Sequence, residues 1–176
     1  MIRFVALLIL PNAQSRCHMI RIGQGFDVHE LEAGDGMTLG GLWVPCDYRL
    51  VAHSDGDIVL HAVMDAMLGA LALGDIGLLF PDTDSKFKGA DSAALTREVR
   101  QLCLQKGYSV SNLDITIVCE VPKIGPVREA MRQCIADVLE TPLDRVSVKA
   151  STTEQLGFIG RGEGVAVMAA VLMRAH

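Results

Sequence analysis

The segment Val165-Ala166-Val167-Met168-Ala169-Ala170-Val171-Leu172 carries eight apolar residues in a row near the carboxyl end of the chain. An apolar run of this length predicts a strand that is buried on both faces. In a two-layer domain, one of those faces would need a covering layer from elsewhere. A second subunit could supply that layer.

Working outward from this segment, hydrophobic periodicity and turn residues predict the other elements. Four more strands are expected over residues 20–26, 37–44, 113–121 and 146–150. Three helices are expected over residues 54–73, 91–106 and 127–139, and loops over 80–84 and 151–164. This order predicts an α+β domain of two layers, with a mixed β-sheet and the helices packed on one face.

The composition is that of one soluble domain, with 176 residues, 50% apolar residues, 21% charged residues and a net charge of −5. Because no run of lysine and arginine occurs, nucleic acid is not expected as a partner. The five cysteines are odd in number, widely spaced and without a C-x-x-C pair. They argue against a disulfide framework and for the reducing cytoplasm.

The first 18 residues stand apart from the rest. Arg3 and the apolar run Phe4–Leu10 resemble a short secretory signal, but the run is too short to cross a membrane, and the segment after it is a poor cleavage site. Met19 lies directly before the first predicted strand. We therefore expect residues 1–18 to be an extension that arises from an upstream start-site assignment, and residues 19–176 to form a single catalytic domain with no membrane partner.

Three residues are candidates for a metal site. Asp27 and His29 are separated by one residue of an extended segment, so their side chains point the same way. His61 lies on an apolar helix, with Asp57 four residues before it and Asp65 four residues after it. Two imidazoles and a carboxylate with an open fourth position are typical of catalytic zinc. The alternative is a buried histidine that is hydrogen-bonded to a carboxylate and binds no metal.

Several segments suit phosphate. His53-Ser54 lies at a predicted helix N-terminus, where backbone N–H groups attract anions. Ser151–Glu154 supplies hydroxyls and a carboxylate, and the glycine-rich segment 160–164 carries Arg161. A helix cap and two flexible turns are the structural alternatives for these segments.

Other motifs give weaker or negative signals. The acidic loops 75–77 and 80–84 could bind polyol hydroxyls or a cation, or be turns only. Gly23-Gln24-Gly25 lacks the third glycine and the following helix of a dinucleotide-binding motif. There is no Walker loop, no G-x-S-x-G motif and no evident cysteine nucleophile.

Taken together, these motifs resemble the 2-C-methyl-D-erythritol 2,4-cyclodiphosphate synthases in order and spacing, from Met19 to the carboxyl end. The segments that carry the resemblance are Ile22–His29, His53–Asp57 with Leu60-His61-Ala62, Gly74–Gly77, Phe80–Asp84, Ser151–Glu154, Gly157-Phe158 and Gly160–Gly164.

The resemblance implies an enzyme of the non-mevalonate isoprenoid pathway. It would convert 4-diphosphocytidyl-2-C-methyl-D-erythritol 2-phosphate into the 2,4-cyclodiphosphate and release CMP. Family members are homotrimers with active sites between adjacent subunits. The nucleophile is the substrate's own phosphate, already ionised at neutral pH, so that positioning and charge neutralisation matter more than a general base.

The resemblance also implies roles for particular residues. Zinc would bind Asp27, His29 and His61, and Glu154 would help to hold a second divalent ion, Mg²⁺ or Mn²⁺. His53 and Thr152 would stabilise the reacting phosphates. The implied substrate-binding set is Asp27, Val28, His29, His53, Ser54, Asp75, Ile76, Gly77, Phe80, Asp82, Thr83, Asp84, Cys119, Pro122, Lys123, Ile124, Gly125, Ser151, Thr152, Thr153, Phe158 and Arg161.

Phe26, Arg161 and Glu163 match the central trimer cavity of the family, where an isoprenoid diphosphate can bind. Two other functions compete with this interpretation. One is a metal-dependent phosphoesterase that uses a zinc-bound water and releases inorganic phosphate. The other is a non-catalytic trimeric ligand-binding protein that has kept the fold.

Overall fold

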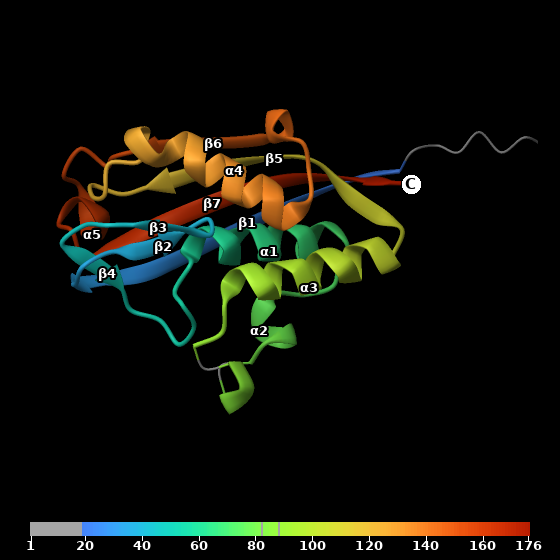
Figure 1. The fold of residues 1–176 in the computed structure, drawn as a ribbon, viewed down its shortest axis with the longest axis horizontal. Coiled ribbons are helices and arrows are strands. Elements are labelled where there is room, and N and C mark those ends of the chain that lie inside the picture. Colours follow the sequence, from blue (N-terminus) through green and yellow to red (C-terminus); the bar gives the residue numbers. More distant parts are fainter. Residues whose placement is uncertain (1–18, 82, 88) are drawn as a thin grey trace, which may run out of the picture.

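A computed structural model describes residues 19–81, 83–87 and 89–176. Its main sheet has five strands in the order β4-β1-β7-β5-β6 (Figure 1). Only β5 and β6 run parallel; the other neighbours are antiparallel. The predicted mixed sheet is thereby confirmed. Its strands are β1 (Ile20–Ala33), β4 (Tyr48–Leu50), β5 (Tyr108–Val118), β6 (Val146–Ser151) and β7 (Gly164–Ala175).

The three long helices α1 (Ile58–Ala70), α3 (Ser92–Gln105) and α4 (Arg128–Leu139) lie on one side of the sheet (Figure 1). Eleven of the thirteen α1 residues are buried, which places this helix in the centre of the core. Two shorter helices, α2 (Ile76–Leu79) and α5 (Gly157–Gly160), interrupt the loops after α1 and β6. Among the described residues, no helix combines the length and the apolar character needed to cross a membrane.

Strand β7 is covered on one face by its own chain. Val167, Val171 and Met173 are buried against the helical layer, whereas Met168 on the opposite face is 39% exposed. The same open face of the sheet carries Phe26, which is 60% exposed. The described part of the chain therefore buries one face of β7, and the second covering layer expected from the sequence would have to come from outside it.

Several predicted boundaries were wrong. Strand β1 continues to Ala33 instead of ending at Phe26, β5 begins at Tyr108 instead of Leu113, and β4 was not predicted. Residues 37–44 form a hairpin, β2 (Met37–Leu39) and β3 (Leu42–Val44), because Gly40 and Gly41 both adopt positive φ and turn the chain. Helix α1 is capped by Asp57 and not by Ser54. The Asp57 carboxylate accepts hydrogen bonds from the N–H groups of Gly40 and Gly41 at 2.8 and 2.6 Å, as well as from the first turn of α1. One buried side chain thus joins the hairpin to the helix.

Helix α1 lies unusually close to β1. A Cβ atom added to Gly23 would lie 1.9 Å from the carbonyl oxygen of Ala66, and one added to Gly25 would lie 1.9 Å from that of Ala62. The two glycines therefore let the helix backbone rest directly on the strand. This contact brings the helix residue His61 to the strand residues Asp27 and His29.

Replacement of Gly25 by alanine is expected to lower the free energy of unfolding by about 3 kcal/mol, because the new methyl group meets helix backbone that cannot give way. Gly69→Ala is the matched control. A Cβ atom added to Gly69, on α1, would lie 3.9 Å from its nearest neighbour, the carbonyl oxygen of Gln24. The Gly69→Ala variant should therefore be as stable as the wild type or more stable by up to about 1 kcal/mol. Urea unfolding at one fixed protein concentration measures both, and equal stability of the two variants would contradict the packing account.

Candidate metal and phosphate site

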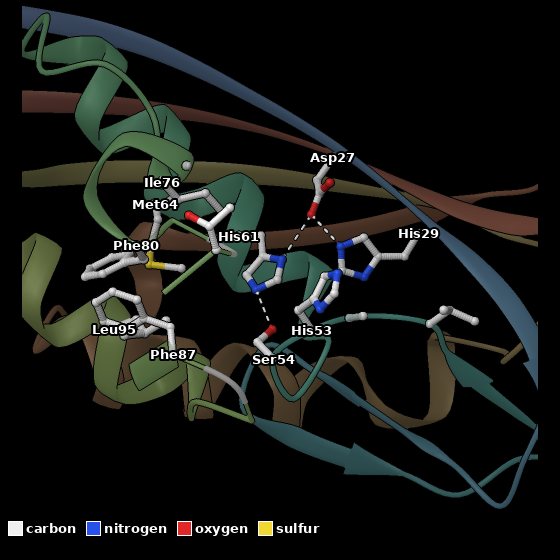
Figure 2. A pocket seen from close by; sticks show the side chains of 14 residues that line it. Asp27, His29, His53, Ser54, His61, Met64, Ile76, Phe80, Phe87 and Leu95 are labelled. Atoms are coloured by element: carbon white, nitrogen blue, oxygen red, sulfur yellow. Dashed lines mark hydrogen bonds and ion pairs between the residues drawn. The ribbon is translucent and has the colours of Figure 1, made fainter. Parts of the chain in front are cut away.

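Three side chains that the sequence singled out meet at one point. The Oδ2 atom of Asp27 lies 3.1 Å from Nε2 of His29 and 3.2 Å from Nδ1 of His61 (Figure 2). The ligand atoms of all three lie within 4.8 Å of one another. Two nitrogens and one carboxylate oxygen thus converge on a space that a single ion could occupy.

The backbone explains why these side chains converge. Asp27 and His29 are alternate residues of β1 and face the helical layer, while Val28 between them is 41% exposed on the opposite face. The Val28 side chain therefore lies away from the site, and only its backbone remains near it. His61 reaches the pair from the first half of α1.

The electrostatics of the cluster favour an anion beside a cation. Burial would raise the pKa of the Asp27 carboxyl, but hydrogen bonds to His29 and His61, and the charge on those rings, hold it well below its usual range. Burial lowers the pKa of His61, but the bond to Asp27 and the nearby negative charges outweigh it, so the pKa is raised. Both shifts favour a negative Asp27 beside a positive His61, and a divalent cation bound here would take the place of a proton on Nδ1 of His61.

The other ring nitrogen of His61 has partners that sequence reasoning missed. Its Nε2 atom lies 3.1 Å from Oγ of Ser92 and 3.2 Å from Oγ of Ser54. Ser92 is fully buried at the start of α3, and its hydroxyl donates to Oδ1 of Asp55 at 2.5 Å. A serine thirty-one residues away from His61 carries no sequence signal for this contact.

The carboxylates four residues from His61 have other partners. The Asp57 carboxylate caps α1 and holds the β2–β3 hairpin. The Asp65 carboxylate accepts the N–H of Ile76 at 2.8 Å and so holds the start of α2. The carboxylate that bonds to the His61 ring is Asp27, from β1, and neither Asp57 nor Asp65.

A pocket of about 530 Å³ opens beside the cluster (Figure 2). Its volume lies in the range of small-molecule binding sites. His53 and Ser54 lie on one wall, and Ile76, Gly77 and Phe80 lie on another. The predicted site residues that line it are Asp27, His29, His53, Ser54, His61, Ile76, Gly77, Phe80 and Thr83.

A second group of predicted residues lies elsewhere in the chain. Thr152 donates to Oε1 of Glu154 at 3.0 Å, and Thr153 donates to Glu120, an acidic residue that the sequence did not single out. The segment Cys119–Gly125 follows β5 beside this group, and the N–H of Cys119 donates to the carbonyl of Ser151. Burial raises the pKa of the Cys119 thiol to about 11, so it is not a nucleophile at neutral pH.

The sheet separates the two groups. Asp27 pairs with Val167, Val167 with Ile117, and Ile117 with Ala150. Three strand spacings place the end of β6 about 14 Å from Asp27 across the sheet. Thr152 and Glu154 of one chain therefore do not share a small ligand's phosphates with Asp27 of the same chain.

The remaining predicted residues are scattered. Asp75 caps α2, and Asp84 accepts the N–H of Lys86. Phe158 belongs to α5, and Arg161 makes a two-pronged ion pair with Glu163 at 2.8 and 2.9 Å. Asp82 lies outside the described residues, as do residues 1–18.

The residues of the cluster fit a divalent metal ion. Nε2 of His29 and Nδ1 of His61 both point at one oxygen of Asp27, so all three ligand atoms face a common point. The set of two imidazoles and one carboxylate suits zinc better than it suits a hard cation such as Mg²⁺.

Comparison with known proteins bears on what this arrangement does. A family model described as the YgbB family matches residues 20–174. The chain belongs to the YgbB family. The family model begins one residue after Met19 and takes in both groups of predicted site residues.

Two curated proteins similar to this chain are named 2-C-methyl-D-erythritol 2,4-cyclodiphosphate synthase. The protein of Shewanella frigidimarina is 56% identical over 157 residues, which cover 89% of this chain and 99% of the relative. The protein of Acinetobacter baylyi is 58% identical over 154 residues, which cover 88% of this chain and 94% of the relative.

Among solved structures, a CDP complex of IspF from Plasmodium falciparum has a TM-score of 0.79 at 38% identity. The match covers 89% of this chain and 96% of that one. The fold found for the YgbB-family chain is thus also that of a solved relative.

Proposed function

We propose that this YgbB-family chain converts 4-diphosphocytidyl-2-C-methyl-D-erythritol 2-phosphate into 2-C-methyl-D-erythritol 2,4-cyclodiphosphate and CMP, a lyase step of isoprenoid biosynthesis. The observation that carries the proposal is the convergence of Asp27, His29 and His61 at the wall of a pocket of about 530 Å³. Relatives with 56% and 58% identity are named for this reaction.

The residues of the pocket suit an intramolecular phosphoryl transfer. The substrate's 2-phosphate attacks the β-phosphorus of the same molecule, one phosphorus–oxygen bond forms, and the bond to CMP breaks. Because the attacking phosphate is already ionised, the chain needs to orient it and to offset its charge, and it needs no general base. Zinc held by Asp27, His29 and His61 would supply Lewis-acid charge neutralisation at the phosphates.

His53 and Ser54 are proposed to bind and orient the reacting phosphates. Both line the pocket next to the metal cluster, and the Ser54 hydroxyl oxygen accepts the N–H of Gly56 at 3.1 Å, which holds it in place. Asp75 and Gly77 are proposed to bind the hydroxyls of the erythritol part, at the wall that α2 forms. The Phe80–Asp84 loop would close the same side of the substrate.

We propose that the other half of each site comes from a neighbouring copy in a homotrimer. Thr152, Glu154 and the cytidine segment Cys119–Gly125 lie across the sheet from the metal cluster of their own chain. The open face of β1 and β7, with Phe26 and Met168 exposed, is the surface that would be covered in such an assembly.

Two groups from the neighbouring copy would then complete the site. Glu154 is an exposed carboxylate beside the Thr152 hydroxyl and would help to hold Mg²⁺ or Mn²⁺ on the diphosphate. Pro122 and Lys123 would hold the cytidine, in keeping with the CDP named in the Plasmodium falciparum complex.

We place the enzyme in the cytoplasm. All four cysteines in the part of the chain that the structure describes are free thiols. Such thiols persist in a reducing compartment.

The products distinguish this reaction from the phosphoesterase alternative. Incubation with the cytidyl substrate, zinc and Mg²⁺ is expected to release CMP in equal amount to substrate consumed, with no inorganic phosphate. Nucleotide chromatography and a phosphate assay measure both products. Release of inorganic phosphate would favour the phosphoesterase, and no turnover with a control synthase active alongside would favour the binding protein.

We also propose that an isoprenoid diphosphate binds in the central cavity of the trimer and regulates the enzyme. Phe26 is 60% exposed, and Arg161 and Glu163 form an exposed ion pair. In the proposed trimer, Arg161 would supply a cation for the diphosphate and Phe26 an apolar surface for the isoprenoid chain.

Farnesyl diphosphate is expected to raise the melting temperature of the wild type by several degrees but not that of Arg161→Ala, because the variant lacks the cation for the diphosphate. Thermal-shift titration measures the effect, with inorganic diphosphate as the control ligand. No shift in either protein, or an equal shift in both, would contradict the proposal.

A further inference from the structure

The Nε2 atom of His61 belongs to a chain of hydrogen bonds that runs through the Ser92 hydroxyl to the Asp55 carboxylate. We propose that Ser92 and Asp55 are positioning residues of the metal site, which fix the His61 ring with its proton on Nε2 and leave Nδ1 free to bind the metal. The inference rests on the proposed metal site formed by Asp27, His29 and His61.

The direction of the hydrogen bonds follows from the number of protons. An ionised carboxylate only accepts, so the short contact of 2.5 Å between Ser92 Oγ and Asp55 Oδ1 uses the single hydroxyl proton of Ser92. The Ser92 oxygen then faces Nε2 of His61 at 3.1 Å with lone pairs alone. That bond exists only if Nε2 carries the proton. In a neutral imidazole, Nδ1 is then the unprotonated nitrogen, and it is the nitrogen that faces Asp27.

Ser54 does not fix the ring in the same way. Its Oγ atom lies 3.2 Å from the same Nε2, but its hydroxyl proton is not used by a carboxylate. Ser54 could therefore donate to Nε2 or accept from it, and it is compatible with either state of the ring. Ser92 is compatible with one state only, which makes it the residue that decides between them.

Burial and further hydrogen bonds also hold Ser92 and Asp55 in place. The Ser92 side chain is fully buried, and its backbone N–H donates to the second oxygen of Asp55 at 3.0 Å. The Asp55 N–H donates to the carbonyl of Ala90 at 3.2 Å. Asp55 thus ties the loop before α1 to the start of α3 through two different atoms of Ser92. A histidine whose second nitrogen is held in this way meets the metal with its ring orientation already set.

Zinc affinity tests the inference without reference to turnover. We expect Ser92→Ala to weaken zinc binding by about 10- to 100-fold in competition with a chromogenic chelator, because loss of an outer hydrogen bond to a ligand histidine has effects of this size. Asp55→Asn is expected to weaken it as well, since the N–H and the hydroxyl of Ser92 donate to different oxygens of Asp55, and in asparagine one of these positions is an NH2 group that cannot accept.

Thr96→Ala is the matched control. Thr96 is also fully buried on α3 and donates its hydroxyl to the carbonyl of Ser92, whereas the side-chain hydrogen bonds of His61 go to Ser54, Asp27 and Ser92. Its removal should cost a similar amount of stability and change zinc affinity by less than about twofold. A loss of zinc affinity as large as that of Ser92→Ala would show that α3 acts through stability alone, and would overturn the inference.

A measurement on the unmodified protein does not depend on any variant folding. Long-range proton–nitrogen NMR of the zinc-loaded, ¹⁵N-labelled chain is expected to place the His61 proton on Nε2. A proton on Nδ1, or a Ser92→Ala variant whose zinc affinity lies within about twofold of the wild type, would overturn the inference but leave the metal site intact. Failure of the wild type to bind zinc at all would overturn both.

Discussion

His61→Ala is expected to abolish stoichiometric zinc binding and to lower kcat/KM by about 10³-fold or more, which is the scale of losing a principal source of charge stabilisation at a reacting phosphate. The variant loses one of three ligands, and the remaining two, Asp27 and His29, lie on one strand and cannot enclose an ion by themselves. Because its neighbours on α1 are apolar and well packed, the variant should fold.

Metal analysis, circular dichroism and steady-state kinetics measure the three effects. His176→Ala is the control, since it removes a histidine at the carboxyl end, away from the pocket-lining residues. Full activity of His61→Ala, or zinc retained at one ion per chain, would contradict the proposed ligand set.

Subunit complementation is expected to restore activity that neither parent variant has. In the proposed homotrimer, His61→Ala would lack the metal half of every site, and Thr152→Ala would lack the phosphate-binding half contributed by the neighbouring copy. In each mixed trimer about one site in three combines an intact half from each subunit, so activity should return to about a third of the wild-type value. Co-expression of the two differently tagged variants, followed by tandem purification and assay, measures this recovery.

The double variant His61→Ala/Thr152→Ala mixed with wild type serves as the control. There both inactive halves lie on one chain, so a trimer with two wild-type chains keeps about one site in three and a trimer with one wild-type chain keeps none. The purified mixed trimers should therefore show about a sixth of the wild-type activity. No recovery in the mixture of single variants, with mixed trimers confirmed by their tags, would contradict active sites shared between copies.

The sequence predicted the contacts that follow from side-chain alternation along a strand and from the apolar pattern of a helix. Alternation along β1 predicted that Asp27 and His29 point the same way, and the apolar character of α1 predicted a buried His61; their atoms meet within 4.8 Å. The prediction that β7 is buried on both faces stays open, because the described chain covers one face and leaves Met168 exposed on the other.

What the sequence did not predict depends on contacts between distant segments. Nothing local marks Ser92 as a neighbour of His61, since the contact arises from the packing of α3 on α1. Gly25 looked like part of an incomplete glycine motif, whereas its role is the close approach of helix and strand. The Gly40-Gly41 pair is a local turn signal that the prediction of one strand over residues 37–44 overlooked. The contact of both N–H groups with Asp57, from another element, carries no local signal.

The central claim is that phosphate of the substrate itself, and not water, attacks phosphorus at the site formed around Asp27, His29 and His61. Turnover of the cytidyl substrate in water enriched in ¹⁸O, followed by phosphorus NMR and mass spectrometry of the products, tests it directly. We predict the cyclic diphosphate and CMP, with neither product carrying oxygen from the solvent. Solvent ¹⁸O in a phosphate of either product, or an open-chain product, would contradict it.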